Sequence, residues 1–247
     1  MPKRGAFSFF DYKAIEPRLT AYFAAKIGYP EFAEQIRAGV DSYTAVAKLV
    51  TGKDEVTDEE RQDWKRTYLS LLYGGGVKTI QLQFPELNRA QAKAMIDTFH
   101  DNWPAVNELQ ARVQRQHQRR GYIVGIDGRH LHMEEYGEHK LLNKLIQGSA
   151  AGLMKQALRN AHRFLTRTGP PYLESRMVSV IHDELILDGP VHELEELNQE
   201  IPPLMVVRED VNEIVPILVD HEVSITTWAD KVGYEEWLNA AREEIAA

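Results

Sequence analysis

The stretch Val178-Ser-Val-Ile-His182-Asp183-Glu184-Leu-Ile-Leu187 decides how this sequence folds. Two short apolar runs rich in strand-forming residues flank three ionisable side chains, a pattern that predicts a tight β-hairpin. Carboxylates at such a tip stand on a rigid base, which suits metal-assisted chemistry because a small misplacement of a ligand costs a large factor in rate. Turns favour polar residues in any case, so solvated turn residues are an equally good interpretation of the triplet alone.

A second carboxylate follows another strand-like run near the start of the chain. The aromatic run Ala6-Phe-Ser-Phe-Phe10 stops at Asp11. The residues Leu19–Ala25 then favour a helix, and Pro17 suits its first turn. Asp11 and Asp183 can therefore converge from neighbouring strands although they lie far apart in the sequence. Two such carboxylates suit Mg²⁺, which binds one or two protein carboxylates together with waters and substrate phosphates.

Composition limits the class of protein. At 247 residues the chain can bury a substantial core, and because it contains no cysteine it forms no disulfide or thiolate metal site. No apolar run is long enough for a membrane span or a signal peptide, so we expect a cytoplasmic protein without a membrane partner. The net charge of −8 argues mildly against a nucleic-acid partner. Bases concentrate, however, in Arg112-Val-Gln-Arg115-Gln-His117-Gln-Arg119-Arg120, which is compatible with a polyanion or with a solvated helix face.

The rest of the chain is mostly helical in pattern. We expect helices over Asp41–Val50, Thr57–Tyr73, Arg89–His100, Ala105–Arg120 and Leu141–Leu165, then an acidic helix ended by Pro202-Pro203 and a terminal helix. We expect strands over Tyr122–Gly128, Arg129–Met133 and Ile217–Ile225. The fold class is therefore α+β, with an antiparallel sheet built from both ends of the chain and a helical insertion between them.

The helix expected over Thr57–Tyr73 carries a third piece of chemistry. Arg61, Lys65, Leu69 and Tyr73 recur at every fourth residue, so two cations and an aromatic ring face the same way. Arginine offers a fork for phosphate and lysine a compact charge beside it. A solvated face is the commoner meaning of so basic a helix, but the two aspartates favour a phosphate-binding role.

Three segments, in this order, resemble motifs A, B and C of the family A DNA polymerases, the bacterial DNA polymerase I type. They are Asp11-Tyr-Lys-Ala-Ile-Glu16-Pro-Arg18, Arg61-x3-Lys65-x7-Tyr73-Gly74 and His182-Asp183-Glu184. Two further segments, Gly121–Arg129 and Asn143-x3-Gln147-Gly-Ser-Ala-Ala151, resemble the family's strand pair after the fingers and its palm helix at the primer–template. The resemblance implies an antiparallel palm sheet with a mostly helical fingers insertion, divided into palm 1–20, fingers 21–120 and palm 121–247.

The same resemblance implies a template-directed DNA polymerase that adds deoxynucleotides to a primer 3′-hydroxyl by two-Mg²⁺ nucleotidyl transfer. Asp11 and Asp183 would hold the ions, with the carbonyl of Tyr12 as a further ligand and Glu184 in a supporting role. Lys65 would donate a proton to pyrophosphate. The incoming nucleotide would contact Arg61, Lys65, Leu69, Tyr73, Glu16 and Tyr43, with Glu16 crowding the 2′ position. Primer–template DNA would contact His182, Asn143, Gln147 and Arg129.

The sequence departs from the family pattern at several positions. Leu69 stands where the family usually has an aromatic residue that stacks on the nucleotide, which predicts weak stacking and poor acceptance of dideoxynucleotides. Tyr43 replaces a common phosphate-contacting histidine, and Pro17 a usual leucine. The chain begins just before motif A, so we expect no thumb or exonuclease domain.

We therefore expect one half of a split polymerase, active in the cytoplasm of a bacterial or phage-infected cell. A protein partner would supply the thumb and the remaining palm. Two alternatives stay open at this point: a catalytically inactive nucleic-acid-binding remnant, and a carboxylate-metal nuclease or phosphohydrolase.

Overall fold

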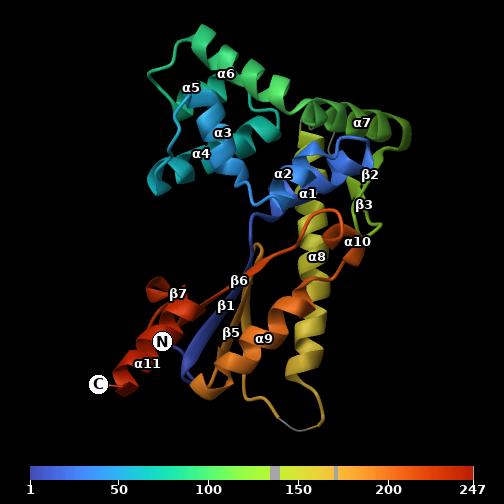
Figure 1. Ribbon diagram of the computed structural model, residues 1–247. Helices are drawn as coiled ribbons and strands as arrows, with labels where there is room; N and C mark the ends of the chain where they lie inside the picture. Colours follow the sequence, from blue (N-terminus) through green and yellow to red (C-terminus); the bar gives the residue numbers. More distant parts are fainter. Residues whose placement is uncertain (134–139, 170–171, 247) are drawn as a thin grey trace. The chain divides into compact units, whose positions relative to one another are not determined.

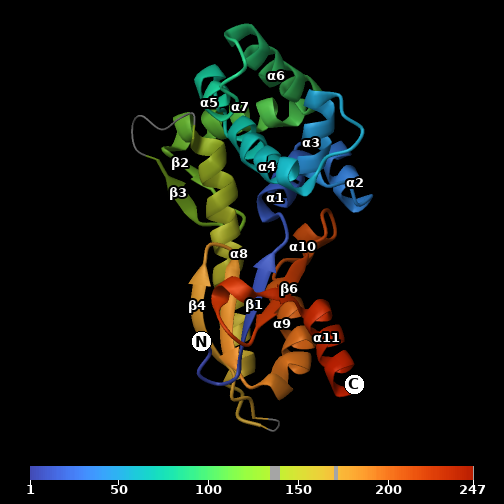
Figure 2. The ribbon, with the colours of Figure 1, turned by 90° about the vertical axis from the view of Figure 1, so that its left-hand side faces the viewer.

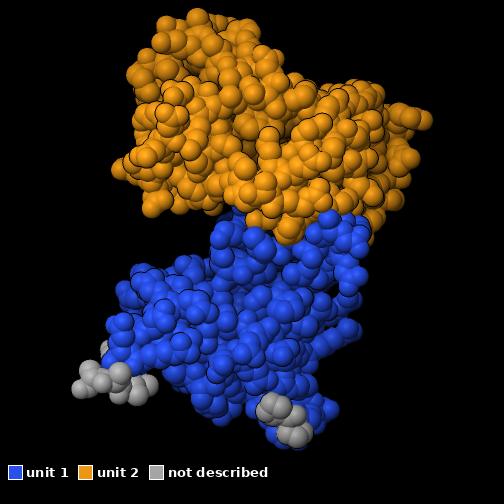
Figure 3. All heavy atoms as spheres, viewed as in Figure 1, with its two compact units in different colours: residues 1–15, 150–213, 217–247 blue, residues 16–149, 214–216 orange. Residues whose placement is uncertain are grey.

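The computed structural model describes residues 1–133, 140–169 and 172–246. The chain forms two compact units, coloured separately in Figure 3. The sheet unit comprises residues 1–15, 150–213 and 217–247, and the helical unit comprises residues 16–149 and 214–216. Each unit is described by itself below.

The sheet unit contains a five-stranded antiparallel sheet in the order β4-β5-β1-β6-β7. Its strands are β1 (Ala6–Tyr12), β4 (Arg176–Ile181), β5 (Glu184–Gly189), β6 (Val219–Ser224) and β7 (Val232–Gly233). The first strand of the chain lies between β5 and β6, which come from its second half (Figure 1). The α+β fold class with strands from both ends is therefore confirmed.

Two helices, α9 (Leu194–Met205) and α11 (Tyr234–Ala246), pack on one face of this sheet. A short helix, α10 (Glu209–Asn212), follows α9 in the chain. The ring of His221 on β6 stacks between Phe10 and Tyr234, with centroid distances of 4.2 and 5.0 Å. The hydroxyl of Tyr12 donates a 2.6 Å hydrogen bond to the carbonyl of Met205 at the end of α9. These contacts fix the strand that carries Asp11.

The prediction that Pro202-Pro203 ends the acidic helix is wrong. Helix α9 continues through both prolines to Met205. Neither proline can donate a helical hydrogen bond, which normally breaks a helix. Here Leu197, Ile201 and Met205 are all fully buried along one face, and tertiary packing of an apolar face supplies most of the stability of a helix in a protein. Burial of this face therefore offsets the lost bonds.

The helical unit holds a run of helices and one small strand pair (Figure 1). They are α1 (Ile15–Lys26), α2 (Glu31–Arg37), α3 (Ser42–Thr51), α4 (Asp58–Leu72), α5 (Val77–Gln83), α6 (Arg89–Asn102), α7 (Pro104–Arg120), β2 (Tyr122–Val124) and β3 (His130–His132). The first turns of α8 (Leu141–Leu165) also belong to this unit, and β2 and β3 lie beside them (Figure 2). Among the described residues, no helix is both long and apolar enough to cross a membrane.

Local capping explains where two of these helices begin. The Asp41 side chain accepts a hydrogen bond from the Thr44 N–H and so caps α3. Thr57 and Glu60 form the predicted capping box at the start of α4, with both reciprocal hydrogen bonds present. Helix α4 ends one residue before Tyr73, and Gly74 follows with a positive φ of 79°. This places Tyr73 at a helix end rather than in its interior.

Candidate active site

The predicted hairpin is present, and its turn is tight. Ile181 pairs with Glu184, so only His182 and Asp183 form the turn between β4 and β5. His182 has a φ of 55°, a left-handed conformation that is uncommon for a residue other than glycine. A positive φ at the first turn residue alone fits a type II′ hairpin turn. Strained backbone of this kind concentrates at functional sites, where the surrounding structure holds it.

Three carboxylates lie in one row across the sheet. Asp11 on β1 is directly opposite Glu184 on β5 and directly opposite Asp220 on β6. Residues paired in this way share one face of a sheet, and like charges there repel each other. The N–H of Tyr12 also donates a 3.3 Å hydrogen bond to the carbonyl of Asp183. The structure thus brings Asp11 beside the turn that carries Asp183.

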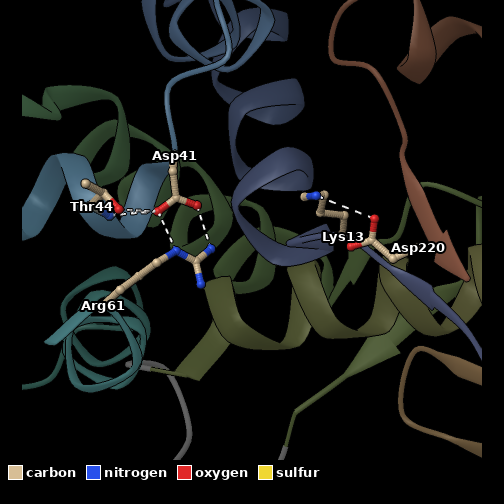
Figure 4. A network of polar contacts seen from close by, with 5 residues as sticks. All are labelled: Lys13, Asp41, Thr44, Arg61 and Asp220. Carbon is tan, nitrogen blue, oxygen red and sulfur yellow. Dashed lines mark hydrogen bonds and ion pairs between the residues drawn. The ribbon is translucent and has the colours of Figure 1, made fainter. Parts of the chain in front are cut away.

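Two lysines balance the negative charge of Glu184 and Asp220, the two outer carboxylates of this row. Lys231 donates a 2.7 Å hydrogen bond to Glu184, and its ammonium lies 2.5 Å from Glu222. Burial disfavours the charge of Lys231, but its bonds to the two glutamates raise its pKa above the ordinary value. Lys13 lies 3.5 Å from Asp220 (Figure 4). The sequence patterns identified neither lysine, because tertiary structure brings them to the row: Lys13 directly follows β1 and Lys231 directly precedes β7.

The donor set near Asp11 fits a hard divalent cation. In the part of the chain that the structure describes, no group of three or more His, Cys, Asp or Glu side chains is arranged as a metal site. Asp11 and Asp183 offer carboxylate oxygens, and Glu184 is engaged by Lys231. Mg²⁺ commonly takes one or two protein carboxylates and completes its shell with waters and substrate phosphates. The two aspartates are therefore a suitable protein contribution to such a site.

In the helical unit, the two predicted phosphate-binding cations, Arg61 and Lys65, both lie over one buried ring. The charged ends of Arg61 and Lys65 lie 5.4 and 5.9 Å from the centroid of Tyr43, which is only 3% exposed. Arg61 also donates two hydrogen bonds, of 3.1 and 2.7 Å, to the carboxylate of Asp41 (Figure 4). Burial alone would raise the pKa of Asp41, but hydrogen bonds from Arg61 and Thr44 lower it. Asp41 was not predicted as a site residue; its capping position was the only signal.

A hollow of about 630 Å³ in the helical unit gathers five of the predicted site residues. They are Glu16, Leu69, Tyr73, Asn143 and Gln147, beside Arg66, Ser70, Gly74, Gly75, Gly76, Thr79 and Lys140. Gln147 donates a 3.1 Å hydrogen bond to the carboxylate of Glu16. Burial, together with the nearby Glu16 carboxylate, raises the pKa of Tyr73. Residues far apart in the sequence therefore form one lined surface.

One position that lines this hollow requires glycine. A Cβ at Gly75 would lie 2.7 Å from the carbonyl oxygen of Ser70, so only glycine allows the chain to pass so close to the end of α4. Arg129 does not line the hollow. Its guanidinium is bonded to the Asp127 carboxylate and donates a 3.0 Å hydrogen bond to the carbonyl of Gly148.

Comparison with known proteins explains why these residues occur together. Residues 1–230 match the model of DNA polymerase family A. The chain belongs to this family. It is 27% identical to DNA polymerase I of Bacillus caldotenax over 232 residues, which is 89% of this chain and 25% of the relative. It is 28% identical to DNA polymerase I of Pseudomonas aeruginosa over 222 residues, which is 85% of this chain and 23% of the relative.

A solved family A structure agrees with the fold. The POL domain of Pol1 from M. smegmatis, in complex with DNA primer-template and dNTP, matches with a TM-score of 0.71 and 26% identity. The match covers 90% of this chain and 40% of that one. The chain therefore spans about a quarter of the length of its curated relatives. Residues 231–247, which include Lys231, β7 and α11, lie beyond the match to the family A model.

Proposed function

We propose that this chain carries out template-directed DNA synthesis as the palm and fingers part of a family A polymerase. The observation that carries the proposal is the placement of Asp11, on the middle strand of the sheet, beside the His182–Glu184 hairpin. The proposal divides the chain into palm 1–20, fingers 21–120 and palm 121–247. The sheet unit lies entirely within this palm, whereas residues 16–20, 121–149 and 214–216 of the proposed palm belong to the helical unit.

The sheet unit would provide the catalytic carboxylates. Asp11 and Asp183 would hold two Mg²⁺ ions, with the carbonyl of Tyr12 as a further ligand. When bound, the ions would activate the primer 3′-hydroxyl and neutralise the charge of the leaving pyrophosphate. Glu184 would act from outside the ligand set, since Lys231 already holds its carboxylate. His182, exposed at the tip of the hairpin, would contact the primer–template.

The helical unit would bind the incoming nucleotide and the template. Arg61 and Lys65 would bind its phosphates, and Lys65 would supply the proton that pyrophosphate takes up. In the hollow, Leu69 would meet the base, while Glu16, held by Gln147, would crowd a 2′-hydroxyl. Tyr73, Asn143, Gln147 and Arg129 would make further contacts with the nucleotide or the DNA. Tyr43, which is only 3% exposed, would support Arg61 and Lys65 from beneath.

We also propose that a protein partner supplies the thumb and the remaining palm. Support comes from an apolar groove of about 380 Å³ in the sheet unit, lined in part by Phe7, Phe9, Val178, Ile186 and Trp228. Strand β4 forms one edge of the sheet, and its Val178, Val180 and Ile181 are all exposed. Exposed apolar patches and open strand edges are typical of surfaces that another chain covers.

Primer extension tests the catalytic proposal. The full chain, with Mg²⁺ and all four dNTPs, should extend a primer, and Asp183→Ala should abolish extension. The matched control is Asp54→Ala, which removes a carboxylate from an exposed loop and should have no effect. Degradation of the primer would identify a nuclease, and binding without turnover would identify an inactive remnant. Either result would overturn the proposal. Pull-down from the native host then tests the partner.

A further inference from the structure

Helix α7 carries a cluster of positive charge that the proposed catalytic residues do not include. Four exposed arginines form this cluster, which we call the α7 arginine face: Arg112, Arg115, Arg119 and Arg120. With Gln116 and Gln118 they line a hollow on the surface of the helical unit. The whole chain has a net charge of −8, so this concentration of arginine runs against the overall composition.

Packing fixes which way this face points. Val106, Leu109 and Val113 are buried on another side of α7, about 120° around the helix from Arg112, Arg115 and Arg119 at about 100° per residue. Gln110 donates a 3.2 Å hydrogen bond to the carbonyl of Leu72 at the end of α4, so α7 is tied to the residue just before Tyr73. From Arg112 to Arg120 the helix rises about 12 Å, since each residue advances about 1.5 Å. The arginines therefore form a short line of charge along α7.

The charge of this line is only partly compensated. Glu108 lies 2.8 Å from Arg112 and 3.0 Å from Arg115, and this one carboxylate serves both. Neither Arg119 nor Arg120 forms an ion pair with a residue that the structure describes. Cations in a last turn stabilise a helix through its dipole, which accounts for Arg119 and Arg120. It does not account for Arg112 and Arg115, which lie one to two turns earlier.

The chemistry of this face fits a phosphate chain. Guanidinium groups bind phosphate oxygens through paired hydrogen bonds. A line of about 12 Å is long enough to contact more than one phosphate of a strand. Directly after α7, the ring of Tyr122 stacks on that of His130 at 3.9 Å, and His130 and His132 are exposed. A basic groove next to aromatic rings is the usual way to bind single-stranded nucleic acid.

We propose that the α7 arginine face binds the unpaired 5′ part of the template strand through its phosphates. The inference rests on the proposed polymerase function, because that function makes a template the relevant strand. It adds a DNA contact outside the motifs that identify the family. Binding here would hold the template on the helical unit without reading its sequence, since phosphate contacts carry no base information.

Fluorescence anisotropy of the full chain in EDTA tests the inference without catalysis. Labelled primer–templates with the same duplex carry a 5′ overhang of either one or twelve nucleotides. The wild type should bind the long-overhang DNA more tightly than the short-overhang DNA, and the ratio of these two affinities is the gain from the overhang. Arg115→Gln/Arg119→Gln should reduce that gain roughly tenfold at about 0.1 M salt and lower the slope of log K against log salt by about 1.4, at about 0.7 per single-strand contact.

Matched variants make the test specific. Arg159→Gln/Arg163→Gln removes the same charges at the same spacing from exposed positions on α8 and should leave the gain intact. Arg115→Lys/Arg119→Lys should keep most of the gain. If the double glutamine variant is unfolded by circular dichroism, Arg119→Gln alone replaces it, because Arg119 has no ion pair to lose.

Three results would overturn the inference: no gain from the long overhang, an equal loss in the α8 variant, or an equal loss on both overhangs. The last would indicate that the face binds duplex DNA. Primer extension by the wild type on the one-nucleotide overhang reports separately on the proposed function, so the two can fail independently.

Discussion

Lys231 donates a 2.7 Å hydrogen bond to Glu184 and so connects a residue beyond the family A match to the β4–β5 hairpin of the sheet unit. Glu184 lies directly opposite Asp11, which in turn lies opposite Asp220. Without counter-charges, three carboxylates in one row would repel one another. Lys231 and Lys13 make the row compatible with a stable sheet.

Replacing Lys231 tests how much the Lys231–Glu184 ion pair contributes to the stability of the fold. The side chains of Lys231 and Glu184 are 27% and 12% exposed, so Lys231→Met leaves a largely buried carboxylate without its cation. We expect the free energy of unfolding in urea to fall by about 1–3 kcal/mol, less than for a fully buried pair because Lys231 is partly solvated. The control Lys13→Met breaks a pair whose side chains are 54% and 55% exposed and should cost less than about 1 kcal/mol. Equal losses in the two variants would contradict this assignment.

Asp41 both caps α3 and holds Arg61, and substitution can separate these two contacts. Asp41→Ser keeps an oxygen that can cap α3 but removes the carboxylate that holds Arg61. We expect the KM for dNTP to rise in this variant while the melting temperature stays near that of the wild type. Asp41→Ala should also lose the cap, at a cost of about 1 kcal/mol. If Asp41→Ser leaves the KM unchanged, Arg61 does not depend on Asp41 for its position.

Leu69 tests the proposed base contact in the hollow. It is half-buried there, beside Glu16 and Tyr73. Leu69→Phe should lower the KM for dNTP and increase incorporation of dideoxynucleotides, because a ring stacks on a base more strongly than leucine does. Leu49→Phe, at an exposed position on α3, is the control and should change neither value. Steady-state single-nucleotide incorporation measures both, and unchanged kinetics in Leu69→Phe would exclude stacking at this position.

His221 should make the sheet unit sensitive to acid. Burial lowers its pKa from 6.5 to about 3. The folded state therefore resists protonation of His221, and stability is full above pH 6.5 and falls as the pH drops towards 3. The fall is about 1.4 kcal/mol per pH unit from this residue alone.

Replacing the imidazole isolates its contribution to acid sensitivity. His221→Phe keeps a ring between Phe10 and Tyr234 and should flatten the dependence of unfolding free energy on pH between about 6 and 4. His192→Gln, at an exposed histidine, should retain the wild-type slope. Urea unfolding at a series of pH values measures the slopes, and a wild-type slope in His221→Phe would show that other groups cause the acid sensitivity.

The features that the sequence predicted well have local causes. Helix α8 has the expected bounds, Leu141–Leu165, because a long apolar periodicity defines it. The capping box at Thr57 and the hairpin at His182-Asp183 depend on residues within a few positions of each other. Family motifs then placed the candidate catalytic residues, whose roles stay predictions.

The features that were missed have tertiary causes. Continuation of α9 through two prolines depends on which face of the helix is buried, and that is decided by strands elsewhere in the chain. The pairing of Asp11 with Asp220 depends on strand register across β1 and β6. The bond between Asp41 and Arg61 joins two residues that are 20 positions apart in the sequence, one at the start of α3 and one on α4. Helices α2 and α5, with seven residues each, are too short for a clear apolar period.

Strand β7 and Lys231 together show that the match to the family A model does not end at a boundary of the fold. The match ends at residue 230, yet the next three residues complete an ion pair and add the last strand of the sheet. A recombinant protein trimmed to the shared region would lose a hydrogen-bonded edge and release Glu184 and Glu222 from their common cation. Domain limits for expression, or for grafting this chain onto a relative, should therefore follow the hydrogen bonds of the sheet rather than the extent of sequence similarity.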